Sequence, residues 1–156
     1  MSSAARTLLP GIVITSDTIE RLRSQYDHCF ACGRTNPIGL GLDGFAIVAG
    51  EVTVSFSPRP EFAGFEDLLH GGIMATALDE VLAWTGILIE GVLAVTATLE
   101  LKFRRPASPD ADYAVVGRVD DRSGSRLRMS GEMRQGREVV AECKGLYLVH
   151  LELEGP

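Results

Sequence analysis

One apolar segment in the middle of the chain constrains the fold more than any other feature. From Ile73 to Ile89 nearly every residue is Met, Ala, Leu, Val, Trp or Ile, and the segment carries a single acidic pair, Asp79-Glu80. Its length and apolar character predict a helix buried at the centre of the core. Because burying a carboxylate costs free energy, an acid in such a helix is usually functional. We therefore expect the chemistry at this pair.

The polar positions of this segment form one narrow stripe on the expected helix. Four residues fall at i, i+3, i+4 and i+7: Thr76, Asp79, Glu80 and Ala83. One acid of the pair can still be an ordinary solvated position, because neighbours on a helix point about 100° apart. A transmembrane helix is disfavoured, because each acid near the middle of a span would cost about 2.5–3.5 kcal/mol. The stripe therefore predicts a core helix and no membrane partner.

The expected helix begins at His70-Gly71-Gly72. The two glycines offer bare backbone N–H groups at a helix N-terminus, where the helix dipole favours a developing negative charge. This start therefore predicts a site for an oxyanion on the same helix as the carboxylate. Two simpler interpretations stay open: the glycines form only a tight turn, and His70 has a structural role.

Length and composition predict one domain that spans residues 1–156. The chain is 46% hydrophobic and has no low-complexity stretch or long linker, so one sizeable core is expected. Residues 1–10 do not resemble an export signal, and we expect a cytoplasmic protein. Three cysteines in this context predict reduced thiols. The net charge of −6 argues against nucleic acid as a partner.

Basic residues gather in one stretch of this acidic chain. From residue 101 to residue 137, nine basic residues stand against five acidic ones, which gives a local charge of +4 and leaves −10 for the remainder. An anionic ligand would find its counter-charges in this stretch. The simpler interpretation, that the arginines form a solvated face of strands, stays open.

The other patterns predict one short helix and several antiparallel strands. Asp17-x-x-Glu20 is a capping-box pattern that opens a helix within an N-terminal extension, residues 1–27. From Val95 to Arg104 apolar and polar residues alternate, which predicts a half-buried strand with its odd-numbered residues on the core face. Turns at 50, 120–125 and 135–136 separate further strands at 45–49, 51–57, 113–119, 126–134 and 139–150. A long helix on one face of an antiparallel sheet makes an α+β domain.

Three motifs follow one another along the chain: Cys-x-x-Cys-Gly-x-x-Asn-Pro-x-Gly-Leu at 29–40, His-Gly-Gly-Ile-x5-Asp at 70–79 and Val-Thr-Ala-x-Leu-x3-Phe-x-Arg-Pro at 95–106. Together they resemble the hotdog-fold acyl-CoA thioesterases of the phenylacetate-thioesterase-like group. The resemblance implies a hotdog core over residues 28–150, with an antiparallel β-sheet wrapped around a central α-helix. It also implies an acyl-CoA substrate, no cofactor, and homodimers that often pair into tetramers, with active sites across the dimer interface.

The resemblance also implies roles for individual residues. Asp79 matches the catalytic carboxylate, which acts as general base on water or as nucleophile on the thioester carbonyl. The backbone N–H of Gly72, with Gly71 beside it, matches the donor that polarises this carbonyl. His70 matches the histidine that orients the turn or touches the thioester. Thr96 matches the strand hydroxyl that helps to hold the water.

Four further residues complete the expected site. Glu80 is the second choice for the catalytic acid. Coenzyme A would be the anionic ligand of the basic stretch, residues 101–137. Arg104 and Arg105 are the first candidates for contacts with its phosphates. Trp84, one helical turn after Glu80, is a candidate for lining the acyl pocket, with a plain core role as its alternative. Whether the acyl group is aryl or fatty stays open.

The pair Cys29 and Cys32 suggests a metal or redox site, but the spacing does not support one. Zinc needs four ligands, and His28 is adjacent to Cys29, so no second pair of ligands stands at a standard spacing. A redox pair lacks its usual βαβ context. We therefore expect no metal, and a tight loop near the mouth of the site.

Two functions outside thioester hydrolysis stay open. A non-catalytic acyl-CoA-binding module is one, since a fold does not fix a function, although such a module would not need a buried acid. A hotdog dehydratase or hydratase is the other. Its site pairs an acid with a histidine on a loop, whereas here His70 directly precedes the helix.

Overall fold

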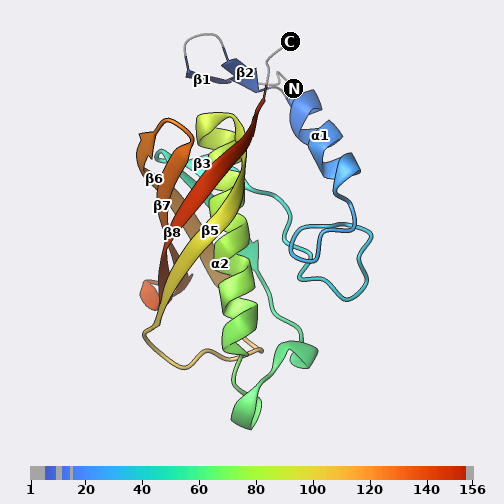
Figure 1. Cartoon of the computed structure of the whole chain (residues 1–156). Helices are drawn as coiled ribbons and strands as arrows, with labels where there is room; N and C mark the ends of the chain where they lie inside the picture. The colour runs from blue at the N-terminus through green and yellow to red at the C-terminus, as the bar shows by residue number, and fades with distance from the viewer. Residues whose placement is uncertain (1–5, 10–11, 15, 154–156) are drawn as a thin grey trace.

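The computed structural model describes residues 6–9, 12–14 and 16–153, and it has an α+β architecture. Figure 1 shows one long helix, α2, with an antiparallel sheet wrapped around it. The six strands are hydrogen-bonded in the order β3-β4-β6-β7-β8-β5. Their bounds are β3 Ala46–Val48, β4 Glu51–Phe56, β5 Val92–Phe103, β6 Tyr113–Ser123, β7 Arg126–Gln135 and β8 Glu138–Glu152. The predicted fold class, a hotdog fold, is confirmed.

The central helix α2 spans Gly71–Thr85 and continues as a π-helical turn, Gly86–Glu90. Its side chains toward the sheet have no exposed surface: Ala77, Leu78, Val81 and Leu82. By length and composition alone, this segment would suit a membrane span, but more than half of it is buried within the domain. Gly91 ends the segment with a φ of 67°, a left-handed conformation that glycine adopts without strain. The predicted core helix is therefore confirmed.

The N-terminal segment holds a helix that the sequence predicts and a hairpin that it does not. The helix α1 spans Ser16–Gln25, where the capping-box pattern places it. Before it, β1 Arg6–Leu9 and β2 Ile12–Ile14 pair antiparallel, so the expected helical extension is only partly helical. The loop after α1, residues 26–45, lies on the side of α2 away from β7 and β8 (Figure 1). It therefore forms a third layer over the helix.

A bulge in β5 overturns part of the predicted alternation. The register against β8 shifts between Thr96 and Thr98, so one residue of β5 is extra at this point. After the shift, Leu99 and Leu101 of the predicted core face are half-buried, but Phe103 at the strand end is 54% exposed. Before it, the faces are exchanged: Val95 is 59% exposed, whereas Thr96 pairs with the fully buried Tyr147. The simple alternation was wrong here because a bulge changes which side chains face the core.

The strand ends differ slightly from the pattern. The turn predicted at 120–125 is present but shorter, because β6 continues to Ser123 after a register shift near Asp121 and only Gly124-Ser125 turn. The turn predicted at 135–136 lies one residue later, at Gly136-Arg137, and Gly136 has a φ of 60°. The three last strands pair consecutively, as predicted.

The two edges of the sheet are very unequal. One edge is β3, which has 3 residues. The other is β5, which has 12 residues and pairs only with β8 within the described part of the chain. A long strand edge of this kind presents a row of free N–H and C=O groups to a further strand. The edge matters here because it carries Thr96.

Candidate active site

The carboxylate of Asp79 is held by two hydroxyl groups from the sheet. The Thr96 hydroxyl donates a hydrogen bond to Oδ1 at 2.7 Å, and the Tyr147 hydroxyl donates to the same oxygen at 2.6 Å. Within the described residues, Oδ2 has no hydrogen-bond partner in this chain. Asp79 is half-buried, and Thr96 is exposed at the strand edge. One oxygen is therefore fixed, while the other is available to a water molecule or a substrate.

Tyr147 is a site residue that the sequence reasoning missed. It lies on β8 directly opposite Thr96, and its ring is fully buried. Burial, followed by the hydrogen bond to Asp79, raises the pKa of its hydroxyl, so this group stays a donor at neutral pH. Gly145 makes room for it, because a Cβ at that position would lie 2.4 Å from the ring. Only the strand register reveals this neighbour, and no local motif marks it.

The start of α2 is capped by its own histidine. The Gly72 N–H donates to Nδ1 of His70 at 2.9 Å, and His70 is the N-cap residue. Gly71 is the first helical residue, so its N–H has no acceptor within the helix. Asp79 lies seven residues after Gly72, which is about 10 Å along the helix axis. The expected oxyanion donor and the carboxylate therefore share one helix, but in a single chain they do not face the same carbonyl group.

Glu80 lies on the other side of the stripe and has different neighbours. Its Oε1 accepts a hydrogen bond from Nε1 of Trp84 at 3.1 Å and lies 4.0 Å from the Sγ atom of Cys29. Burial raises the pKa of Glu80 to about 7. The two acids of the pair are therefore separated: Asp79 faces the strand edge, and Glu80 faces the loop after α1.

A largely apolar cavity of about 330 Å³ lies between α1, the loop, α2 and the first residues of β5. Glu80 and Trp84 both line it, so the expected contribution of Trp84 to a pocket has a geometric basis. The Trp84 ring stacks on Phe45 with ring centroids 4.9 Å apart, and the Arg23 guanidinium lies 5.2 Å above it. The cavity can accommodate an apolar group next to Glu80.

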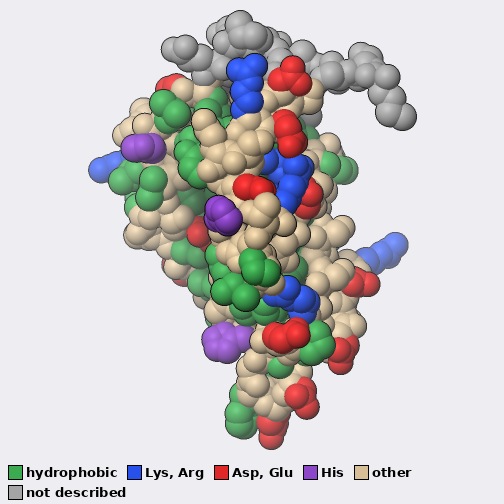
Figure 2. Space-filling model, turned by 90° about the vertical axis from the view of Figure 1, so that its right-hand side faces the viewer, with side chains coloured by type: hydrophobic (Ala, Val, Ile, Leu, Met, Phe, Trp, Pro, Cys, Tyr) green, Lys and Arg blue, Asp and Glu red, His purple; other side chains and the backbone are tan. Residues whose placement is uncertain are grey.

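Ion pairs connect α1 to the loop after it on the outer side of this cavity. Arg23 pairs with Asp43 at 2.7 Å, and Arg34 pairs with Glu20 at 2.8 Å and with Asp43 at 3.3 Å. Figure 2 shows the face of the molecule on which basic and acidic side chains alternate in this way. The network joins α1 to the loop and keeps the loop over α2.

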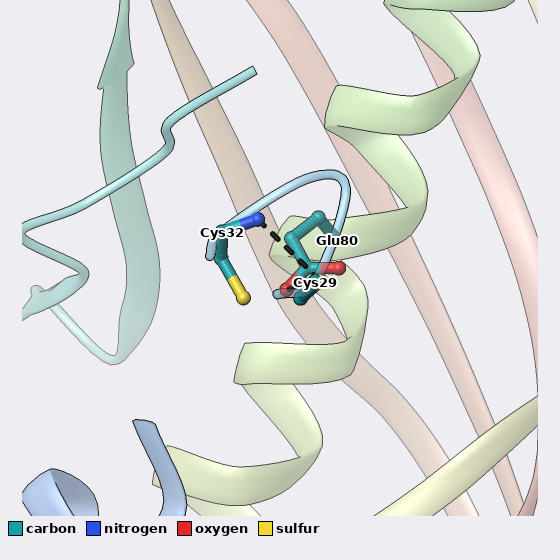
Figure 3. A group of neighbouring side chains, drawn as sticks. All are labelled: Cys29, Cys32 and Glu80. Atoms are coloured by element: carbon teal, nitrogen blue, oxygen red, sulfur yellow. Dashed lines mark hydrogen bonds between the residues drawn. The ribbon is translucent and has the colours of Figure 1, made fainter. Parts of the chain in front are cut away.

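Cys29, Cys32 and Glu80 are the residues that could hold a metal ion (Figure 3). The pKa of the Cys29 thiol is lowered to about 5, mainly by a hydrogen bond from the Cys32 thiol and also by backbone N–H groups of the turn. The pKa of Cys32 is raised by the same hydrogen bond and by burial. Of the two thiols, Cys29 is therefore the more acidic.

The two arginines expected at the phosphates are engaged within the chain. Arg104 pairs with Glu142 at 2.6 Å, and Arg105 pairs with Glu138 at 3.7 Å. Both arginines are exposed. They lie beyond the end of β5, next to β8, at the same end of the domain as the start of α2, since a Cβ on Gly71 would lie 3.4 Å from the Phe103 ring.

Sequence comparison relates this chain to thioesterases. Residues 67–142 match the thioesterase superfamily. The chain is 30% identical over 95 residues to the acyl-coenzyme A thioesterase THEM4 of Bos taurus, and 30% identical over 82 residues to an uncharacterized protein of Schizosaccharomyces pombe. These stretches cover 60% and 51% of this chain, but only 38% and 46% of the two relatives. The chain thus spans less than half the length of the curated relatives it matches.

Solved structures share the fold. A phenylacetic acid degradation-related protein of Ralstonia eutropha is 26% identical, with a TM-score of 0.62 over 70% of this chain and 86% of that one. The phenylacetic acid degradation protein PaaI of Thermus thermophilus is 21% identical, with a TM-score of 0.64 over 70% and 93%. A Streptococcus mutans protein solved with acetyl-CoA is 17% identical, with a TM-score of 0.65 over 72% and 93%. Part of the chain, residues 67–142, thus matches the thioesterase superfamily, and the sheet wrapped around one helix gives the whole domain the hotdog fold.

Proposed function

We propose that this protein hydrolyses acyl-CoA thioesters to the free acid and coenzyme A. The hydrogen bonding of Asp79 is the main support for the proposal. Thr96 and Tyr147 hold Oδ1 and leave Oδ2 available as general base or nucleophile. The 30% identity to a protein named as an acyl-coenzyme A thioesterase supports it. Proteins of the same fold solved with acetyl-CoA and with coenzyme A support the choice of substrate.

In the proposed reaction, Asp79 acts on the thioester carbonyl directly or through water. As general base, Oδ2 takes a proton from water while the water oxygen bonds to the carbonyl carbon. The C–S bond then breaks, and coenzyme A leaves as a thiolate, which afterwards takes up the proton. As nucleophile, Oδ2 itself forms the new bond, and water hydrolyses the resulting anhydride. Thiolate is a good leaving group, so neither route requires a dedicated general acid.

A second copy of the chain completes the proposed site. The carbonyl oxygen gains negative charge, and a fixed N–H group aimed at it is worth about 3 kcal/mol or more. The α2 start of the same chain lies about 10 Å from Asp79 along the helix axis, which is too far to supply that group. We infer that Gly71 and Gly72 of a second copy supply it, with Gly72 exchanging its bond to His70 for the carbonyl oxygen. His70 then orients the turn.

The long edge of β5 is the surface that joins the two copies. It carries Thr96, and it is flanked by apolar side chains that are more than half exposed in one chain, Val95 and Phe103. Antiparallel pairing of two such edges about a two-fold axis satisfies the free backbone groups and extends the sheet. It also brings the site residues of one copy next to the other copy, as a site built across the interface requires.

The cavity beside Trp84 is the proposed place of the acyl group. Its walls include Ile87, Leu93 and Ala94, and Glu80, the residue after Asp79, also lines it. Arg104 and Arg105 stay the predicted contacts of the coenzyme A phosphates. The cavity volume of about 330 Å³ admits both an aryl-acetyl group and a medium-length fatty chain, so the acyl group is left to the experiment.

The alternatives fit the geometry less well. A hydratase or dehydratase would pair Asp79 with a histidine, but within one chain His70 is nine residues away, or about 13 Å along the helix. A non-catalytic binder has no use for a carboxylate that two hydroxyl groups orient while one of its oxygens is free. Acyl-CoA hydrolysis therefore remains the proposal.

A panel of acyl-CoAs tests the function directly. Purified protein is incubated with acetyl-, medium-chain, long-chain and phenylacetyl-CoA, and free thiol release is followed with a chromogenic disulfide. We expect catalytic release with at least one substrate. Tight binding of acyl-CoA without thiol release would identify a binding module instead, and water addition to an enoyl-CoA would identify a hydratase.

A further inference from the structure

Three metal-ligand side chains from two elements converge outside the Asp79 site. The ligand atoms of Cys29, Cys32 and Glu80 all lie within 4.8 Å of one another. The cysteines come from the loop after α1, and Glu80 comes from α2, 51 positions after Cys29. Figure 3 shows the loop lying against the helix, with the three side chains close to one another. In the hydrolysis proposed above, none of the three side chains moves a proton or attacks the carbonyl, although all three line the cavity proposed for the acyl group.

The turn between the two cysteines is shaped to hold a thiolate. The backbone N–H of Cys32 donates to Sγ of Cys29 at 3.5 Å, and the Gly33 N–H closes the turn on the Cys29 carbonyl at 2.8 Å. Gly33 is required at this position, because a Cβ there would lie 2.3 Å from the Asp27 carbonyl oxygen. A Cys-x-x-Cys-Gly turn with N–H groups aimed at sulfur holds a thiolate without a side-chain cation.

The cluster gathers acidic groups without a neutralising partner. Glu80 makes no ion pair with a basic side chain within the described residues, and the nearby Arg23 is engaged by Asp43 and by the Trp84 ring. All three ligand residues are half-buried, and Oε1 of Glu80 lies 4.0 Å from the Cys29 sulfur. Two sulfur ligands with one carboxylate oxygen select a borderline-soft ion.

We propose that Cys29, Cys32 and Glu80 bind one Zn²⁺ ion, with the fourth position of the tetrahedron open toward the cavity and filled by water. The expectation of no metal relied on the spacing of the cysteines alone, which gives no indication of a third ligand on a distant helix. Zinc is bound by cysteine sulfur at about 2.3 Å and by carboxylate oxygen at about 2.0–2.2 Å. Ligand atoms within 4.8 Å of one another need only small side-chain adjustments to reach these distances.

The ion would fasten the loop to α2 at the wall of the cavity. The cluster lines the same cavity as Trp84. The far part of the loop is anchored by Leu42 in the core and by the ion pair of Arg23 with Asp43, whereas the segment around Cys29 adds mainly the hydrogen bonds of its own turn. A metal link between residue 29 and residue 80 would therefore set the shape of the cavity. Its loss would loosen the loop without disturbing Thr96 or Tyr147.

Metal content and spectroscopy of the full chain test the proposal without any turnover assay. Protein produced with added zinc and purified without chelator is dialysed, and its zinc is measured by mass spectrometry. We expect one zinc per chain and an X-ray absorption spectrum with two sulfur and two lighter ligands. Zinc well below one per chain after loading, or a spectrum with light ligands only, would overturn the proposal.

Single variants separate a three-ligand site from adventitious binding by the cysteines. Cys29→Ser and Glu80→Gln should each weaken zinc binding by about tenfold or more in a chelator competition. Cys143→Ser is the matched control, because Cys143 is buried in β8 and outside the cluster, and it should keep one zinc. Unchanged affinity in Glu80→Gln, with a native circular dichroism spectrum, would contradict the carboxylate ligand. If that variant does not fold, the sulfur count of the wild-type spectrum decides.

Discussion

At the scale of single residues, the unequal use of the two Asp79 oxygens gives the sharpest prediction. Asp79→Asn keeps a side chain of the same size, but its amide neither accepts the proton nor attacks the carbonyl. We expect the variant to bind acyl-CoA and to lose kcat by about a hundredfold or more, which corresponds to about 2.7 kcal/mol of transition-state stabilisation. Steady-state thiol release and binding of a non-hydrolysable thioether analogue measure the two effects.

The control for this variant is an acid of the same kind away from the site. Asp110→Asn changes an exposed aspartate in the loop before β6, so its kcat should equal that of the wild type. Wild-type turnover in Asp79→Asn would move the chemistry to Glu80 or remove the enzyme proposal.

Tyr147 is a positioning residue and gives the second prediction. Tyr147→Phe removes one of the two donors to Oδ1, so the Asp79 carboxylate can rotate about its remaining bond to Thr96. We expect kcat to fall by about tenfold with KM unchanged, because a geometric change near the reacting atoms acts in the transition state. Loss of the buried hydrogen bond should lower the free energy of unfolding by about 1 kcal/mol.

Tyr113→Phe is a matched control for this change. Tyr113 is also buried, and its hydroxyl donates to the Ser108 backbone oxygen at 2.7 Å, away from Asp79. It should show a similar loss of stability with normal turnover. If both variants lose kcat equally, the tyrosine at 147 serves the fold and not the carboxylate.

Some site residues could be predicted from a local sequence pattern, and others could not. Asp79 stands out because an acid in an apolar helix is costly, and the glycines stand out because they begin that helix. Tyr147 does not stand out, because a tyrosine within an apolar strand is ordinary, and its role depends on a strand register set by a bulge. The third ligand of the cysteine cluster was missed for the same reason, since only the folded chain brings Glu80 to the loop.

At the scale of secondary structure, the free edge of β5 gives the third prediction. Val95→Lys places a charge beside this edge, and a two-fold axis would bring two such charges close together. We expect the dimer to dissociate, and turnover to fall with it, because the second copy supplies the α2 start. Light scattering after size-exclusion chromatography measures the mass.

Val48→Lys is the control at the opposite edge of the sheet. Val48 on β3 is 58% exposed, against 59% for Val95, so the two variants alter surface hydrophobicity equally. It should leave the dimer intact. A wild type that is monomeric and fully active would remove the two-copy site altogether.

The elements themselves were largely predictable, whereas their pairing was not. Hydrophobic periodicity and turn residues predict the central helix and five of the six main strands. For β5 they predict the residue range, but not which side chains before the bulge face the core. In the sheet, β5 pairs with β8 and not with β6, the next strand along the chain, and residues 104–112 connect β5 to β6 across the sheet. Local patterns do not encode such non-local pairing, which depends on packing around α2.

At the scale of the whole molecule, the uneven charge of the chain is mostly neutralised once it folds. Arg118 and Arg122 of the basic stretch pair with acids from other elements, among them Glu51 and Glu90. The positive charge that the sequence shows between residues 101 and 137 is therefore spread over local ion pairs. A phosphate group has to compete with a carboxylate for each arginine that is paired in this way.

Arg104 and Arg105 give the last prediction, because they are exposed and held only by ion pairs of a kind worth about 0–1 kcal/mol. A phosphate that carries more charge than a carboxylate can displace Glu142 or Glu138 at little cost. Replacing both arginines by Ala should raise KM for acyl-CoA by about tenfold and leave kcat nearly unchanged, since contacts remote from the thioester bind ground state and transition state alike.

Salt and substrate length test whether that effect is a phosphate contact. Exposed charges are screened over about 8 Å at physiological ionic strength, so added salt should raise the wild-type KM toward that of the double variant. A truncated thioester without the nucleotide should be hydrolysed equally by both proteins, because it offers no phosphate to either. If the double variant is equally impaired on the full-length and the truncated substrate, the arginines act through Glu142 and Glu138 on the end of β8, and coenzyme A is bound elsewhere.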